Sequence, residues 1–444
     1  KKQVILMNET KLDTKQIIVS GFALFAIFFG AGNLIFPPFL GKIYGSTWLV
    51  ASFGFILTGA GLACISVISM AKRKGNVKEF TNLAGNKLGS LTIILIAMTL
   101  GPLGGIPRTG ATSAEVMIEA GLPIPYIFFI IAFFAVTLIL ILTDSKIIDI
   151  IGKYLTPALL IVLAVMIIAG IINPIGEINT INITQGEVFN KSLIEGYNTM
   201  DALAAIAFAP IIIKSLLEKG YEENLIKKTI AVTLIAACGL ILVYISLTYL
   251  GSTSSIRFNY MTSRVALLIA ISNAILGSFG KYILAAIIVL ACFTTSVGLT
   301  SSIADMLYKT FDRKISYKLI AVFITIISVI LSLVGVDRII EFTSPLLTFA
   351  YPVVLVMIIY NIFEINFTNR FRIISFYLVA IISLCQSMIS YVSMAKPELA
   401  DEISKVISWL PMYRLGFPWL IPFIIILAMG LLFARKDEKV YALA

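Results

Sequence analysis

The first long apolar segment of the chain is interrupted in its middle, and this interruption constrains the fold more than any other feature. The segment runs from Gln16 to Phe39, and Gly30, Gly32 and Asn33 lie near its centre. Irregular backbone is tolerated in the membrane core only where it lines a cavity or is buried in protein. Discontinuous helices of this kind build substrate and ion sites in secondary transporters. The segment therefore favours a transporter over a simply anchored chain.

The rest of the chain is apolar enough for repeated membrane crossing. Of its 444 residues, 59% are hydrophobic and 13% are charged, and the mean hydropathy is +1.00. A spanning helix needs about 20 predominantly apolar residues. The stretches that meet this requirement are 16–39, 48–71, 89–119, 124–143, 155–172, 196–213, 230–250, 281–308, 319–335, 339–363, 373–394 and 416–434. The sequence thus predicts an all-α integral membrane protein with twelve transmembrane helices.

The basic residues predict the orientation of these helices. Most of the 34 Lys and Arg residues fall on one face if both ends of the chain are cytoplasmic, as the positive-inside rule requires. The net charge of +10 therefore reflects the orientation of the chain in the lipid bilayer, and no nucleic-acid partner is expected. The chain contains no histidine, which excludes histidine proton relays and histidine-based catalytic sites. No cofactor is expected.

The sixth stretch is predicted to be interrupted as well, at Ala207-Phe208-Ala209-Pro210. Proline has no amide proton, and its ring clashes with the preceding helical turn. Two interrupted helices five spans apart indicate two five-helix repeats. Because five is odd, the second repeat enters the membrane from the opposite face, and the site is expected where broken helices 1 and 6 meet.

An inverted repeat of this kind gives the chain a predicted organisation in six parts. They are a cytoplasmic tail (1–15), the first five-helix repeat (16–172), an outer loop (173–195), the second, inverted repeat (196–363), accessory helices 11 and 12 (373–434) and a second cytoplasmic tail (435–444). A helix-like stretch around Val265–Leu276 is expected to act as an outer lid.

Five motifs occur in order from the first stretch to the tenth. They are Gly21–Pro38 (GFALFAIFFGAGNLIFPP), Gly101–Gly110 (GPLGGIPRTG), Gly196–Ala205 (GYNTMDALAA), Cys292–Ser301 (CFTTSVGLTS) and Ala350–Pro352. Together they resemble the branched-chain amino acid:cation symporter family, the bacterial system II carriers for leucine, isoleucine and valine, in the amino acid–polyamine–organocation superfamily. The resemblance implies a leucine-transporter type of five-plus-five inverted repeat in a bacterial cell membrane.

A zwitterionic amino acid needs amides for its carboxylate and carbonyls for its ammonium group, and a broken helix offers both. We expect the main-chain amides of Ala31, Gly32 and Asn33 to bind the carboxylate. The carbonyls from Phe28 to Gly30 and from Ile206 to Ala207 are expected to bind the ammonium group. The alternative is helix packing through the two glycines, which does not explain an asparagine at this depth.

The aliphatic side chain of such a substrate requires an apolar pocket. Phe208 is the main candidate for its wall, with Phe28 and Phe29 as alternates, although each can instead be ordinary core. Pockets of this kind discriminate by only about 1–3 kcal/mol per methylene, so leucine, isoleucine and valine are expected to compete. The small residues that leave room for a branched side chain are Ala204, Ala205 and Ala209.

The resemblance also implies sodium as the coupling ion, bound between the first and eighth stretches. The implied ligands are the hydroxyls of Thr300 and Ser301 and the carbonyls of Val297, Ala26 and Phe29. Hard cations prefer oxygen ligands of this kind. The alternative is that each hydroxyl bonds back to the preceding helical turn. A second sodium site is not expected, because Leu203 stands where a hydroxyl residue would be needed.

Arg108 is a charged residue inside a predicted stretch, where it needs a partner or water. Glu115, about two helical turns further on, and Asp201, in the sixth stretch, are the candidate partners. A gating or structural ion pair is favoured over direct contact with substrate.

The leading interpretation is a sodium symporter that imports branched-chain amino acids by alternating access. A proton-coupled carrier that uses Asp201 or Glu115 remains open, as does a carrier of the same fold for another small amine or a nucleobase. An enzyme is disfavoured because no nucleophile–base pair or metal-ligand cluster is evident, and a channel because no filter motif is evident. ATP coupling within the chain is excluded by the lack of a phosphate-binding loop.

Overall fold

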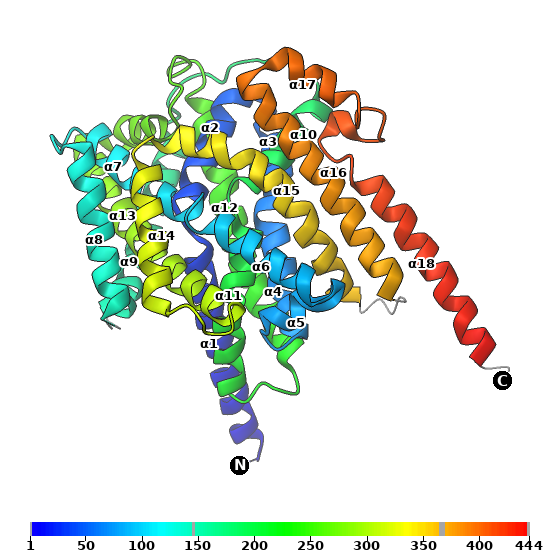
Figure 1. The fold of residues 1–444 in the computed structure, drawn as a ribbon. Helices are drawn as coiled ribbons and strands as arrows, with labels where there is room; N and C mark the ends of the chain where they lie inside the picture. The colour runs from blue at the N-terminus through cyan, green and yellow to red at the C-terminus, as the bar shows by residue number, and fades with distance from the viewer. Residues whose placement is uncertain (1, 144–146, 364–368, 442–444) are drawn as a thin grey trace.

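The computed structural model describes residues 2–143, 147–363 and 369–441, and the regular elements in these ranges are all helical (Figure 1). The helices are α1 (Lys2–Phe28), α2 (Ala31–Tyr44), α3 (Trp48–Ile56), α4 (Leu62–Lys72), α5 (Val77–Thr81), α6 (Asn86–Leu100), α7 (Gly105–Glu119), α8 (Tyr126–Leu142), α9 (Ile147–Ile172), α10 (Gln185–Tyr197), α11 (Asp201–Glu218), α12 (Leu225–Thr253), α13 (Arg264–Thr310), α14 (Tyr317–Ser332), α15 (Val336–Phe363), α16 (Asn369–Ala395), α17 (Pro397–Ser404) and α18 (Leu420–Tyr441).

Seven segments within these ranges are long and apolar enough to cross a membrane. They are Ala31–Lys72, Asn86–Glu119, Gln185–Glu218, Leu225–Thr253, Arg264–Thr310, Val336–Phe363 and Phe371–Ala395. The shorter apolar helices are Thr14–Phe28, Tyr126–Leu142, Pro157–Ile172, Tyr317–Ser332 and Leu420–Leu432. Each predicted stretch coincides with at least one of these segments, which confirms the all-helical membrane class. The predicted tails continue α1 and α18, while residues 1 and 442–444 lie outside the described ranges.

The predicted break in the first stretch is confirmed. Helix α1 ends at Phe28, and α2 begins at Ala31. Gly30 between them is extended, with φ −107° and ψ −173°. Its amide donates to the Asn33 Oδ1 atom at 3.2 Å, so the asparagine side chain satisfies a donor that the break leaves free.

The second break is not where it was predicted. Residues 207–210 lie inside the continuous helix α11, and the break falls at 198–200, between α10 and α11. Met200 there has a left-handed backbone with φ 65°. The Thr199 hydroxyl donates to the Gly196 carbonyl at 2.9 Å, a local bond of the kind that competes with helix. Because the sixth helix therefore starts at Gln185, part of the predicted outer loop 173–195 is helical.

Pro210 does not break α11 because buried packing surrounds it. Residues 201–209 are all buried. A proline inside a helix removes one backbone bond, and neighbouring groups can compensate for that loss in membrane helices. The position of the break instead follows the short polar side chains of Asn198 and Thr199.

Two other predicted stretches are also irregular. The third is divided at Gly101–Gly104 into α6 and α7, so that Arg108 lies near the start of α7. In α13 the backbone turns at Gly277, which has φ 68°. This turn separates the predicted lid around Val265–Leu276 from the helix that holds the predicted sodium ligands.

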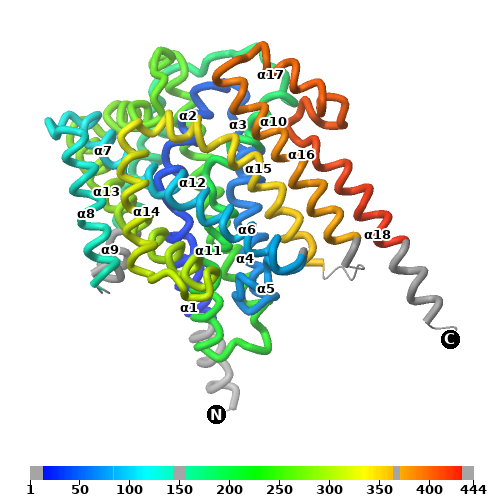
Figure 2. The backbone as a smooth tube through the Cα atoms, in the orientation of Figure 1, coloured from blue at the N-terminus to red at the C-terminus, as the bar shows by residue number. Residues whose placement is uncertain are grey.

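Close backbone contacts hold the broken first helix against α12. A Cβ atom added at Gly41 of α2 would lie 1.8 Å from the Thr248 carbonyl oxygen, and one added at Gly251 of α12 would lie 2.0 Å from the Pro38 carbonyl oxygen. Small residues permit such approach between membrane helices. Figure 2 shows α8 at one edge of the molecule and α16 and α18 at the other, with α11 and α12 between them.

Candidate functional site

The two helix breaks meet at a small cavity. Its volume is about 40 Å³, which is room for a few water molecules but well below the roughly 300–1,000 Å³ of ordinary ligand sites. The cavity is therefore too small in this structure to hold an amino acid. The lining residues include Phe28, Gly30, Ala31, Gly32, Asn33, Gly105, Arg108, Thr109, Thr199, Met200, Asp201, Ala204, Phe208, Thr295 and Leu299.

A hydrogen-bonded triad joins the first break, the second break and α12. The Asn33 Nδ2 atom donates to the Asp201 Oδ2 atom at 2.7 Å and also to the Tyr244 hydroxyl. The Tyr244 hydroxyl in turn donates to Asp201 Oδ2 at 2.9 Å. All three residues are buried. Asn33 therefore faces side chains of the site as well as the Gly30 backbone. Tyr244 lies in an otherwise apolar stretch, so no local sequence pattern marks it as a site residue.

Arg108 points its guanidinium at the second break. The Nη1 atom donates to the Asn198 carbonyl, and the Nη2 atom donates to the Thr199 carbonyl at 3.2 Å. The guanidinium carbon lies 5.4 Å from the centre of the Phe36 ring, within cation–π range. A Cβ atom added at Gly32 would lie 3.0 Å from Nη2. Arg108 thus contacts both broken helices, at the end of α10 and at the start of α2.

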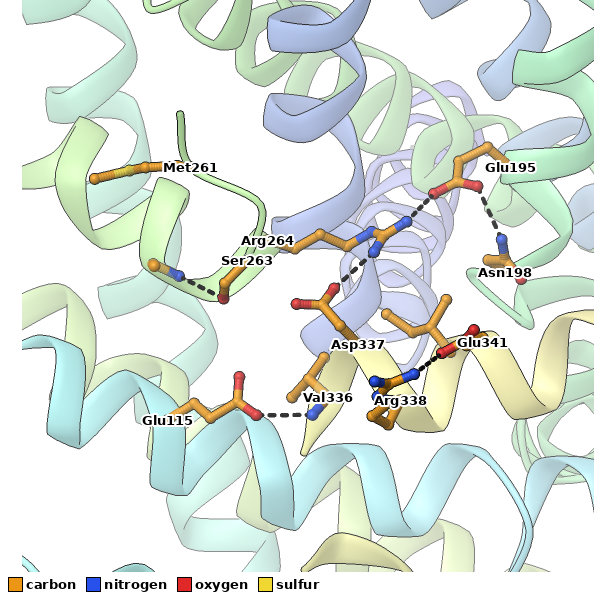
Figure 3. A network of polar contacts seen from close by, with 12 residues as sticks. Glu115, Glu195, Asn198, Met261, Ser263, Arg264, Val336, Asp337, Arg338 and Glu341 are labelled. Atoms are coloured by element: carbon orange, nitrogen blue, oxygen red, sulfur yellow. Dashed lines mark hydrogen bonds and ion pairs between the residues drawn. The ribbon is translucent and has the colours of Figure 1, made fainter. Parts of the chain in front are cut away.

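The predicted acidic partners of Arg108 do not form ion pairs with it. Within the described ranges, the ion pairs of the structure include neither Arg108 nor Asp201. The Glu115 Oε1 atom accepts from the Val336 amide at 2.7 Å, at the start of α15 (Figure 3). This bond satisfies a free donor at a helix N-terminus, and it draws Glu115 away from the cavity.

The structure places only part of the predicted apolar pocket at the cavity. Phe28, Phe208 and Ala204 line it, and the Phe208 ring lies 3.7 Å from a Cβ atom added at Gly298. Phe29 instead stacks on Phe25, with ring centres 5.0 Å apart. The predicted pocket residues outside the lining are Ala205 and Ala209, which are buried, and Ala207, which faces a larger cavity.

The predicted sodium ligands on α13 have partners within the protein. The Thr300 hydroxyl donates to the Ser296 carbonyl at 2.7 Å, and the Ser301 hydroxyl lies 3.0 Å from the Tyr317 hydroxyl. Thr300 thus has the back-bond that was the structural alternative. Helix α13 does run beside the first break, because the Thr295 Cγ2 atom lies 3.7 Å from a Cβ atom added at Gly30. Val297 is buried in α13, Ala26 lies in the last turn of α1, and Phe29 directly follows that helix in the break.

A vestibule of about 510 Å³ lies on the side of the molecule that α5 covers, at the lower face in Figure 1. Residues from α5, α6, α11 and α13 line it, among them Lys78, Ser90, Ala207, Ser301 and Asp305. This vestibule reaches Ser301, one of the predicted sodium ligands. Its walls come from four separate helices, so no local sequence pattern predicts it.

A second polar cluster, here called the latch, is centred on Arg264 at the start of α13 (Figure 3). Arg264, the first residue of α13, donates from Nη1 to Asp337 Oδ1 at 2.6 Å and from Nη2 to Glu195 Oε1 at 3.2 Å. Its guanidinium carbon lies 4.4 Å from the centre of the Phe39 ring and 5.5 Å from that of Phe36. The latch joins α13, α15, α10 and α2, and sequence spacing alone carried no signal for it.

Comparisons with known proteins identify the family of the chain. A family model described as "Branched-chain amino acid transport protein" matches residues 13–437. The branched-chain amino acid permeases BraB and BrnQ of Bacillus subtilis (strain 168) are each 34% identical to the chain, over 428 and 423 residues. The alignments cover 94% and 93% of this chain and 95% of each relative. The branched-chain amino acid transport system 2 carrier protein of Pseudomonas aeruginosa is 31% identical over 441 residues, with coverage of 97% and 98%.

Two solved transporter structures share the fold. One is Mhp1, a nucleobase-cation-symport-1 family transporter in a closed conformation, with a TM-score of 0.60, 15% identity and 92% coverage of both chains. The other is MhsT in complex with L-phenylalanine, with a TM-score of 0.51, 16% identity and coverage of 84% of this chain and 98% of that one. The fold is thus of the leucine-transporter type. On the sequence matches, the chain belongs to the branched-chain amino acid transport protein family.

Proposed function

We propose that the chain imports leucine, isoleucine and valine across a bacterial cell membrane by sodium symport with alternating access. The observation that carries this proposal is the small cavity where the two helix breaks meet, with a vestibule towards α5 and the Arg264 latch near the start of α13. We assign twelve spans to the chain in a five-plus-five inverted repeat, with both termini in the cytoplasm. The vestibule then faces the cytoplasm, and the latch faces outward.

The cavity has the groups that a branched-chain amino acid needs. The first amides of α2, at Ala31 and Gly32, have no partner within their own helix, and they lie at its positive end. Phe28, Phe208 and Leu299 contribute apolar surface to the same lining. The names of BraB, BrnQ and the Pseudomonas carrier support this substrate class.

Sodium is proposed to bind between the end of α1 and the hydroxyls of Thr300 and Ser301. A hydroxyl that donates its proton to a carbonyl keeps lone pairs that can face a cation, so the bond from Thr300 to Ser296 is compatible with this role. Ser301 lines the vestibule, which supplies a route for the ion to leave.

A specific observation also favours proton coupling as a second candidate. Asp201 is 3% exposed, and its Oδ2 atom accepts hydrogen bonds from the neutral groups of Asn33 and Tyr244, while Arg108 attracts it without a described ion pair. A buried acid that forms no ion pair can exchange a proton during a transport cycle.

Uptake of labelled isoleucine into proteoliposomes separates the two couplings. Under the sodium proposal, an inward sodium gradient drives uptake and an inward proton gradient does not. Thr300→Ala should then raise the sodium concentration for half-maximal uptake about tenfold. Thr294→Ala is the matched control, because the Thr294 hydroxyl also bonds back along α13, to Ala291 at 3.0 Å, and is not a proposed ligand. Uptake driven by protons alone would move the coupling to Asp201.

A further inference from the structure

We propose that Arg108 and Asp201 bind the two charged ends of the substrate, Arg108 the α-carboxylate and Asp201 the α-ammonium group. This inference rests on the proposed function, because it assumes an amino acid as the cargo. It replaces the sequence-based preference for an ion pair of Arg108 with an acidic residue of the chain.

Arg108 is a buried cation without an anionic contact. The residue is 6% exposed, and its two described hydrogen bonds go to carbonyl oxygens of Asn198 and Thr199. A charge in a membrane interior is costly, and such residues mark sites for ligands or ions. The opposite charge of Asp201 attracts Arg108 across the cavity, but the two side chains form no described ion pair. Among the described residues, no carboxylate is thus in contact with the Arg108 guanidinium.

The start of α2 adds a second positive group at the same place. Gly32, in the first turn of α2, lies so close to the guanidinium that an added Cβ atom would be 3.0 Å from Nη2 and 3.3 Å from the guanidinium carbon. The N-terminus of a helix carries a partial positive charge. A guanidinium also matches the two oxygens of a carboxylate in a forked geometry. Both features point to a carboxylate as the group that completes this part of the cavity.

Only one of the two predicted carbonyl groups for the ammonium lies at a break. The carbonyls of Ile206 and Ala207 lie inside α11, whereas Phe28 and Gly30 do line the cavity; neutral carbonyls alone would leave the ammonium charge without a counter-charge. The carbonyls at the actual break, those of Asn198 and Thr199, accept from Arg108. Asp201 is the acidic residue in the cavity lining.

The Asp201 carboxylate retains capacity for a further donor. Its Oδ2 atom accepts from Asn33 and Tyr244, and a carboxylate has about four lone-pair sites. The cavity then holds one cation and one anion, which complements the two ends of a zwitterion. A ligand that lacks either end would leave one of the two charges buried and unpaired.

The test is competition binding to the purified full-length carrier with three ligands: leucine, leucinol, which lacks the carboxylate, and 4-methylpentanoate, which lacks the ammonium group. For the unaltered protein we expect leucine to bind at least about 100-fold more tightly than either analogue, since sites built for polar groups strongly reject ligands without them. Arg108→Gln should reduce the preference for leucine over leucinol to a few-fold. Asp201→Asn should do the same for leucine over 4-methylpentanoate.

Arg264→Gln is the matched control, because it removes an arginine that also contacts Phe36 but lies in the latch. It should leave both preferences unchanged. Equal binding of leucine and leucinol by the unaltered protein would overturn the assignment of Arg108, whether or not the Arg108 variant folds. Preserved preferences in folded Arg108→Gln and Asp201→Asn variants would overturn both assignments and leave the proposed function standing. An unaltered protein that binds none of the three branched-chain amino acids would instead refute the proposed function itself.

Discussion

Arg108 on α7 and Arg264 at the start of α13 both face the ring of Phe36, at 5.4 Å and 5.5 Å, yet their other partners differ in charge. Arg264 contacts two carboxylates, those of Glu195 and Asp337. Arg108 contacts two carbonyl oxygens. An arginine neutralised by the chain can hold elements together, whereas a buried arginine that lacks a contacting anion is suited to bind one. The comparison separates the latch from the binding site by charge, although both use the same residue type.

The two arginines are also connected through Asn198. Its carbonyl accepts from Arg108, and its side-chain Nδ2 atom donates to Glu195 Oε2 at 3.0 Å. Glu195 then pairs with Arg264 (Figure 3). A shift of the second break on substrate binding would therefore reach the latch through a short chain of polar contacts.

The largest expected effect is that of Arg108→Gln on transport. Loss of one partner of a buried charged contact costs about 2–5 kcal/mol, so kcat/KM for leucine uptake should fall by at least about 30-fold. Arg108→Lys keeps the positive charge but lacks the planar guanidinium that can bind both oxygens of a carboxylate. Its uptake activity should therefore lie between those of Arg108→Gln and the unaltered protein. Full activity in Arg108→Gln would show that the comparison between the two arginines is wrong.

Arg264→Gln should act mainly on stability. The change leaves the carboxylates of Glu195 and Asp337 without their shared cation, and unsatisfied buried groups cost about 1–3 kcal/mol. These two side chains are 22% and 38% exposed, so water solvates them in part and the loss should lie in the lower part of that range. Thermal unfolding of the purified protein measures it. In combination with Glu195→Gln, the loss should be smaller than the sum of the two single losses. Additive losses would indicate that the two residues do not act as one latch.

Alanine substitutions of the two glycines at the first break, Gly30 and Gly32, should have smaller effects on leucine transport and test how closely Arg108 must be positioned. Gly32→Ala adds a methyl group 3.0 Å from Arg108 Nη2 and 3.2 Å from the Phe36 ring, whereas Gly30→Ala adds one with its nearest neighbour at 3.7 Å. The added methyl group should displace the guanidinium, and misplacement of a binding group by about 1 Å is costly. We therefore expect Gly32→Ala to raise KM for leucine about tenfold. Gly30→Ala should change KM by less. The reverse order would place the critical contact away from Arg108.

The smallest effect is expected for the exposed ion pair Lys74–Glu222, in which the Lys74 Nζ and Glu222 Oε1 atoms lie 2.7 Å apart. The bond with Glu222 raises the pKa of Lys74, and the bond with Lys74 lowers the pKa of Glu222. Any stability from Glu222 is thus present above its unfolded pKa and lost as the pH falls through the folded value, while that from Lys74 is lost as the pH rises. Both side chains are exposed, so Lys74→Gln should leave the midpoint of thermal unfolding unchanged at neutral pH. A clear drop would mean that this pair, unlike most at surfaces, stabilises the fold.

Features that depend on neighbouring residues were predictable. The apolar stretches follow from the length that a membrane requires, and the first break follows from Gly30 and Asn33, whose own hydrogen bond caps α2. The same local signal was present in Asn198 and Thr199, but the more conspicuous Pro210 drew the prediction to the wrong turn. Proline weakens a helix by one backbone bond, and packing around α11 decides whether the helix continues.

The sequence by itself determined the helical membrane class, the family and the first broken helix, because hydropathy, glycine content and motif order are local properties of a chain. Only the tertiary structure decided what each charged side chain contacts. Arg108 turns to carbonyls of a break 90 residues away in sequence, Glu115 caps α15, and Arg264 joins three other helices. Such contacts depend on how the helices pack, since the energy of a buried charge is set by neighbours that are distant in sequence.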